Sequence, residues 1–166
     1  MTVDDKAEDL LQKSFDHLYE KLQRDGSLAM ISAKGLSLHD TLTLASVVAQ
    51  EAPDDANQKM IAAVFQNRLE NNIRLGSDVT YQYAYKMGYC DENLPSCDSV
   101  YNTRIHEGLP PGPISNMNYS SIQAVLHPTL NDNFYFVAGD DGQIYYAKTE
   151  DEHQSNVDNY CHELCR

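Results

Sequence analysis

Hydrophobic residues at helical spacing mark the first element of the chain. Its apolar positions recur every three or four residues: Leu11, Phe15, Leu18 and Leu22. This period predicts one amphipathic helix over residues 5–24, with Gly26 just after its end. The stretch 27–35 is less regular and is interpreted as a linker. Neither segment indicates chemistry, so residues 1–36 are expected to form an N-terminal helix and connector.

Two further helices are predicted on either side of Pro53. The first of them ends near Glu51 and has the capping-box spacing of Ser37 and Asp40 at its start. The next opens directly after Pro53 and ends at Asn71. Its buried face is formed by four apolar residues: Ile61, Val64, Phe65 and Leu69. The short connection predicts a helical corner with Glu51 beside it.

Glu51 is the most informative side chain of this region. Leu44, Val48 and Glu51 fall at i, i+4 and i+7, so the carboxyl lies on the apolar face of its helix. It also lies in the last turn, where the helix dipole opposes negative charge. Desolvation and the dipole both favour the protonated form, and a carboxyl that is protonated near neutral pH can act as a general acid.

Long loops dominate the middle of the chain. Residues 73–117 are rich in turn residues and contain one short helix, predicted near residues 78–85. The segment 108–114 has three prolines between glycines, which makes a stiff, non-repetitive loop. This loop is interpreted either as a rigid turn without a role or as the preorganised rim of a binding groove.

The end of the chain carries the predicted β-structure. After a helix near residues 120–126, the segments 134–137 and 144–147 predict a β-hairpin around a glycine-rich turn. A C-terminal helix is predicted from the capping box at Thr149 through Leu164. This order predicts an α+β fold, with helices packed around a small antiparallel hairpin and with long loops that form a groove.

Composition narrows the class of protein. The chain has 166 residues, of which 42% are hydrophobic, and this is enough for one globular domain with a real core. The net charge of −13 argues against a nucleic-acid partner and is otherwise typical of a well-dissolved protein. No apolar run reaches membrane-spanning length, and the first 26 residues lack a signal-peptide layout.

Four cysteines form two close pairs: Cys90 with Cys97, and Cys161 with Cys165. A disulfide could close the loop between the first two, and the second two would lie one turn apart on a helix. The alternatives are four free thiols, cross-pairing, or a metal site that also uses His162. The spacings do not match the usual zinc pattern, so no metal is predicted. A disulfide would fit an extracytoplasmic location.

The motifs of several enzyme classes are absent from the sequence. It has no Gly-x-Ser-x-Gly elbow, no Walker loop, no Gly-x-Gly-x-x-Gly and no His-Glu-x-x-His. Polar and aromatic residues instead fill the segments 74–83 and 101–104, and such residues suit sugars. Structural roles are the alternative, with Asp78 as a helix cap and Tyr101 as part of the core.

The order of motifs along the chain is more specific than its composition. The motifs are Leu42-Thr43-Leu44-Ala45-Ser46-Val47-Val48-x-x-Glu51, Ala63-Val64-Phe65-x-Asn67-Arg68-Leu69, Arg74-Leu75-x-Ser77-Asp78-x-Thr80, Tyr101-Asn102-Thr103, Gly108-Leu109-Pro110-Pro111-Gly112-Pro113-Ile114 and Phe134-Tyr135-Phe136-Val137. They resemble the endolytic murein transglycosylases of the MltG (YceG-like) family. Residues 37–166 are therefore interpreted as a transglycosylase catalytic domain.

The resemblance implies a reaction and a location. It implies cleavage of peptidoglycan glycan strands between N-acetylmuramic acid and N-acetylglucosamine, with 1,6-anhydro ends, no cofactor and Glu51 as the catalytic acid. Full-length members carry an N-terminal membrane anchor and a LysM-like part, so this chain is expected to be a soluble fragment of an extracytoplasmic enzyme. The cell-wall synthesis machinery is an expected partner, whereas nucleic acid is not.

The polar and aromatic residues of these motifs give the expected site. The predicted substrate contacts are Ser77, Asp78, Tyr101, Asn102, Thr103, Pro111 and Asn116. Asp78 is expected to position Asn102 or fix a loop, and Arg68 to pack at a helix end or reach a substrate carboxylate. Ala49 replaces a second acid found in many members, which favours Glu51, and Val79 replaces a common proline. Two rival functions stay open: a non-catalytic cell-wall glycan-binding module, and a hydrolytic muramidase that uses Glu51 with Asp78.

Overall fold

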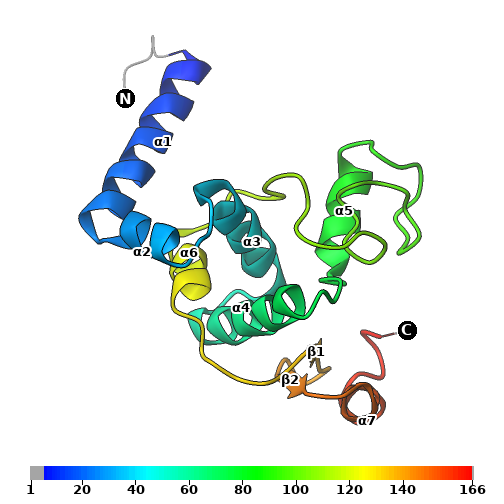
Figure 1. Ribbon diagram of the computed structural model, residues 1–166. Coiled ribbons are helices and arrows are strands. Elements are labelled where there is room, and N and C mark those ends of the chain that lie inside the picture. The colour runs from blue at the N-terminus through cyan, green and yellow to red at the C-terminus, as the bar shows by residue number, and fades with distance from the viewer. Residues whose placement is uncertain (1–5, 166) are drawn as a thin grey trace. The chain divides into compact units, whose positions relative to one another are not determined.

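The computed structural model describes residues 6–165, which form seven α-helices and one two-stranded antiparallel sheet (Figure 1). This confirms the α+β class. The chain divides into two compact units, Met1–Leu38 and His39–Arg166. Within the described residues, no helix is both long and apolar enough to cross a membrane.

The first unit contains α1 (Ala7–Arg24) and α2 (Ser27–Ala33). The first helix is confirmed, although residue 5, its expected start, lies outside the described residues. The interpretation of 27–35 as a linker is wrong. Gly26 adopts a left-handed conformation (φ 81°), so the chain turns sharply and a second helix begins at once.

Three helices build the core of the second unit: α3 (Leu38–Glu51), α4 (Asp55–Glu70) and α6 (Tyr119–Leu126). Seven consecutive or near-consecutive positions of α3 are buried, and α4 packs along α6. The corner between α3 and α4 is held by the Asp54 carboxylate, which accepts the Asn57 N–H at 2.9 Å. The Gln58 amide donates to the Ala52 carbonyl at 2.8 Å. The predicted corner at Pro53 is confirmed.

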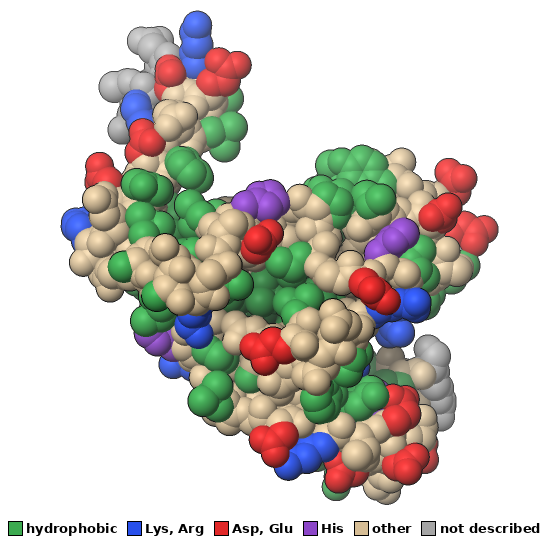
Figure 2. Space-filling model, in the orientation of Figure 1, with side chains coloured by type: hydrophobic (Ala, Val, Ile, Leu, Met, Phe, Trp, Pro, Cys, Tyr) green, Lys and Arg blue, Asp and Glu red, His purple; other side chains and the backbone are tan. Residues whose placement is uncertain are grey.

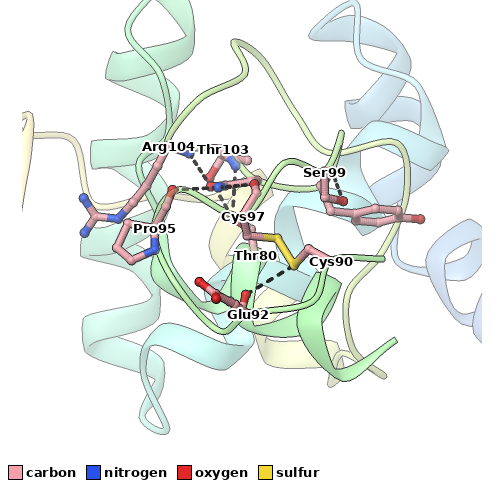
Figure 3. The surroundings of a disulfide bond; sticks show 10 residues. Thr80, Cys90, Glu92, Pro95, Cys97, Ser99, Thr103 and Arg104 are labelled. Carbon is pink, nitrogen blue, oxygen red and sulfur yellow. Dashed lines mark hydrogen bonds between the residues drawn. A yellow bond between two sulfur atoms is a disulfide. The ribbon is translucent and has the colours of Figure 1, made fainter. Parts of the chain in front are cut away.

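The middle segment holds α5 (Asp78–Lys86), which is close to its predicted bounds. After α5, a disulfide joins Cys90 to Cys97 and closes a loop (Figure 3). The proline-rich loop is tied to α3, because the Ile114 N–H donates to Ser46 Oγ at 2.9 Å. This stiff loop therefore braces the helix that ends in Glu51.

The hairpin consists of β1 (Tyr135–Ala138) and β2 (Ile144–Ala147). Tyr135 pairs with Ala147 and Ala138 with Ile144, as expected for a tight antiparallel turn. The helix α7 (Glu150–Tyr160) packs on both strands, while β1 contacts α4 (Figure 1). The capping box at the start of α7 is confirmed: the Glu152 N–H donates to Thr149 Oγ1.

The C-terminal helix ends four residues before Leu164, so its predicted end is wrong. The last turn is replaced by a bend in which the Asp140 carboxylate accepts the N–H groups of residues 162–164. These bonds compete with helix continuation, and a disulfide joins Cys161 to Cys165 in the same bend.

Candidate functional site

A cleft of about 430 Å³ opens in the second unit between two walls of different origin. What we call the first wall consists of Glu51, residues 75–78 and Arg104. The second wall consists of side chains from the hairpin and α7, among them Tyr135, Ile144, Glu150, His153 and Val157. Between these walls α4 contributes Phe65 and Arg68.

Glu51 lies in the last turn of α3 and is only partly accessible from the cleft. Its Oε1 atom accepts a hydrogen bond from the Ser77 hydroxyl at 2.5 Å. Burial raises the pKa of Glu51; the Ser77 hydrogen bond partly opposes this, and the nearby charge of Asp78 adds to it. The sequence predicted this direction from the apolar face of the helix. The carboxyl can therefore stay protonated at a higher pH than an exposed glutamate.

Ser77 is held in place by two threonines. Its backbone N–H donates to Thr103 Oγ1 at 3.2 Å, and its carbonyl accepts the Thr80 hydroxyl at 2.6 Å. The Thr103 N–H in turn donates to Thr80 Oγ1 at 3.1 Å. All three side chains are buried. The predicted residues Ser77 and Thr103 thus lie together. With Thr80 they form a hydrogen-bonded cluster next to Glu51, which we call the clasp.

Asp78 lines the cleft and forms an ion pair with Arg104, a residue that the sequence did not single out. Their side chains are 45% and 43% exposed. Asp78 was expected to position Asn102 or to fix a loop, and its ion pair is with Arg104 rather than with Asn102. The Asn102 amide donates to the carbonyls of Pro95 and Cys97, at 2.8 and 2.9 Å, and so anchors the disulfide loop.

The other predicted substrate contacts lie outside the cleft lining. Asn102 is fully buried. Tyr101 packs against the rings of Tyr83 and Tyr89, with centroids 5.1 and 5.6 Å apart. Pro111 and Asn116 are exposed, and the Pro111 carbonyl is 2.9 Å from the ring nitrogen Nε2 of His39. Their contact with sugars stays a prediction.

Arg68 is placed more centrally than the sequence suggested. Its Nε donates to the Phe134 carbonyl at 2.5 Å, and its Nη1 donates to the carbonyls of Leu75 and Arg74 at 2.9 and 3.1 Å. Its guanidinium also lies over the Tyr135 ring, 4.9 Å from the centroid. Arg68 therefore links the first wall to the second, rather than only packing at the end of α4.

Sequence reasoning missed the polar residues of the second wall. His153 stacks on Tyr135 with centroids 5.3 Å apart, and burial lowers the pKa of His153, which favours its neutral form. Glu150 lies in the first turn of α7. The hairpin motif was visible in the sequence, but no local signal says that the hairpin faces Glu51. No group of three or more His, Cys, Asp or Glu side chains with a metal-binding arrangement occurs among residues 6–165.

The chain belongs to the YceG-like family, whose profile matches residues 1–159. It is 39% identical over 130 residues to the endolytic murein transglycosylase of Bacillus subtilis (strain 168), which covers 75% of this chain and 35% of that protein. The enzyme of the same name from Streptococcus pneumoniae R6 is 31% identical over 164 residues, covering 92% of this chain and 29% of that one.

A solved structure has the same fold. A YceG-like protein from Listeria monocytogenes superposes with a TM-score of 0.80 at 34% identity, covering 93% of this chain and 50% of that one. The predicted family is thereby confirmed. This chain spans about a third of the length of the curated relatives that it matches.

Proposed function

We propose that this chain is the catalytic part of an endolytic lytic transglycosylase that cuts peptidoglycan glycan strands between N-acetylmuramic acid and N-acetylglucosamine. The observation that carries the proposal is a carboxyl with a raised pKa, Glu51, at the wall of a cleft. The names of the relatives, endolytic murein transglycosylases, support the choice of substrate.

The reaction needs one group that acts first as an acid and then as a base. Protonated Glu51 donates its proton to the glycosidic oxygen as the bond from C1 breaks, and the acetamido group of the substrate meets the positive charge at C1. The Glu51 carboxylate then removes the proton from the C6 hydroxyl, whose oxygen closes the 1,6-anhydro ring on C1. General acid–base assistance of this kind contributes roughly 10²–10⁴-fold.

Hydrolysis would require a second carboxylate, which activates water or attacks C1. Asp78 is the nearest candidate on the first wall, but one of its oxygens is engaged by Arg104 Nε. This engagement supports a lytic reaction that Glu51 carries alone. The 1,6-anhydro product is its chemical signature.

Digestion of purified sacculi tests the proposal. The wild-type chain should release fragments with 1,6-anhydro ends, identified by mass spectrometry, whereas Glu51→Gln should release roughly 10²–10⁴-fold less and still sediment with sacculi. Fragments with reducing ends would instead identify a hydrolytic muramidase. Binding without any soluble fragment would identify a glycan-binding module, and either result would overturn the proposal.

The proposal includes an extracytoplasmic location with a membrane anchor elsewhere in the full-length protein. Two disulfides support this location, because disulfides persist in oxidising compartments outside the cytoplasm. Peptidoglycan itself also lies outside the cytoplasmic membrane. Contact with the cell-wall synthesis machinery stays a prediction.

A further inference from the structure

We infer that Ser77 is a positioning residue for Glu51: its hydroxyl binds Oε1 and leaves Oε2 as the oxygen that exchanges a proton with the substrate. The inference rests on the proposed function and deepens it. It also changes the role expected for Ser77, from a contact with sugar to a contact with the catalytic acid.

The geometry at Glu51 carries the first step of the argument. Ser77 is 4% exposed, and its Oγ lies 2.5 Å from Glu51 Oε1. A neutral carboxyl carries its proton on one oxygen, and an oxygen that accepts a hydroxyl hydrogen is the poorer place for it. The acidic proton is therefore directed to Oε2. Without the Ser77 hydroxyl, this hydrogen bond would no longer distinguish the two oxygens.

The second step of the inference rests on the hydrogen bonds that Thr80 and Thr103 make to the backbone of Ser77. The backbone N–H and carbonyl of Ser77 are both bonded, to Thr103 and Thr80 respectively, so the hydroxyl leaves the backbone at a fixed point. The residue before Thr103, Asn102, ties this clasp to the loop closed by the disulfide. A donor that is fixed before the reaction needs no reorganisation during it.

The same hydrogen bond acts on both halves of the reaction. A hydroxyl that donates to a carboxylate stabilises the charged form, and the Ser77 bond accordingly lowers the pKa of Glu51 against the effect of burial. Ser77 thus stabilises the carboxylate that forms after the first proton transfer. Its loss should raise the pKa of Glu51 and move the alkaline limb of the activity profile to higher pH.

Ser77→Ala tests this role by two readouts. Titration of the Glu51 carboxyl by ¹³C NMR, assigned with Glu51→Gln, should give a higher pKa in Ser77→Ala than in the wild type. The value of kcat should fall roughly 10- to 100-fold, with little change in KM, which is typical for loss of a hydrogen bond to a charged group. Ser77→Thr, which keeps the hydroxyl, should restore both.

Ser121→Ala is the matched control. Ser121 is also a fully buried serine, but its hydroxyl donates to the Asn118 carbonyl at the start of α6, and it does not line the cleft. This variant should leave the pKa of Glu51 unchanged. Thr103→Val, which loosens the clasp but keeps the Ser77 hydroxyl, should shift the pKa in the same direction by less.

An unchanged pKa of Glu51 in Ser77→Ala would overturn the inference, as would a shift of the same size in Ser121→Ala. The titration needs no substrate, so it gives its result even for a chain that does not cut glycan. Failure of the proposed function would be seen separately, as absent anhydro fragments from the wild type.

Discussion

The two walls of the cleft differ in how firmly their polar side chains are held. The first wall is backed by Thr80 and Thr103, which are buried and hydrogen-bonded to each other and to Ser77. On the second wall, α7 has no buried residue, and its polar side chains face solvent or the cleft. Glu51 therefore lies on the wall that is backed by buried, hydrogen-bonded side chains, and the opposite wall is the more exposed one.

The two walls differ less in charge than in the burial of their polar side chains. Acidic side chains are scattered over the face shown in Figure 2 rather than gathered into one patch. Both walls contain acids, since Glu51 and Asp78 lie on one and Glu150 on the other. What distinguishes Glu51 is its burial, because burial is the main cause of its raised pKa.

The largest expected difference is in activity, between Glu51→Gln and Glu150→Gln. The two substitutions are chemically identical and fall on opposite walls. Glu51→Gln should lower the release of fragments from sacculi by roughly 10²–10⁴-fold, because it removes the acid. Glu150→Gln should change it by only a few-fold, as measured by quantitative chromatography of the products. Equal losses would remove the distinction between the walls.

The next effect is on stability, and it concerns the residue that links the walls. Arg68→Ala should lower the free energy of unfolding by about 2–3 kcal/mol, because three backbone carbonyls lose a charged donor. Arg74→Ala removes an arginine that donates a single 3.3 Å bond at the surface, and should stay within about 0.5 kcal/mol. Urea unfolding measures both, and a similar cost for the two would contradict the linking role.

The two disulfides are expected to differ in how much each stabilises the protein. Replacing Cys90 and Cys97 by serine should cost about 2 kcal/mol, because the loop that Asn102 anchors is no longer closed. Replacing Cys161 and Cys165 should cost less, since a terminal segment can detach without unfolding the rest. Thermal unfolding of the two double variants measures the difference. The opposite order would mean that the tail supports the fold more than the loop does.

The smallest effect is a gain in stability from Glu51→Gln. The folded state raises the pKa of Glu51, so this group favours folding while it is protonated and loses that contribution as pH rises through the folded-state pKa. Glu51→Gln has no ionisable side chain at this position, so its stability does not fall in this way as pH rises. It should exceed the wild type by roughly 0.5–2 kcal/mol above that pKa, and the gain should vanish at low pH.

Unfolding curves at several pH values test this expectation, with Glu150→Gln as the control on the exposed wall. A gain that is independent of pH would show that ionisation of Glu51 is not its cause. A gain of equal size in the control would place the effect outside the buried site.

Local patterns were enough for most of the elements. The corner at Pro53, the capping box at Thr149 and the hairpin all depend on residues close in sequence, and all three are confirmed. The two failures have different causes, one local and one distant in sequence. Gly26 allowed a new helix where a linker was expected, and Asp140, distant in sequence, captured the backbone that would have extended α7.

The candidate site was predicted only in part. Glu51 stood out because its position on an apolar helical face can be read from spacing alone, and its burial agrees with that reading. Asn102 and Thr103 stood out in the motifs, but spacing did not show that both side chains are turned into the protein. Arg104 was passed over because its partner, Asp78, lies 26 residues away.

The sequence by itself determined the family, most of the helices and the acid at the end of α3, because each depends on short motifs or on spacings within a few residues. Only the tertiary structure decided what surrounds that acid. The Ser77 hydroxyl, the Arg68 link and the wall made by the hairpin and α7 come from segments 17 to about 100 residues away from Glu51. Desolvation and hydrogen bonding act through space, so the pKa of Glu51 is a property of the assembled cleft.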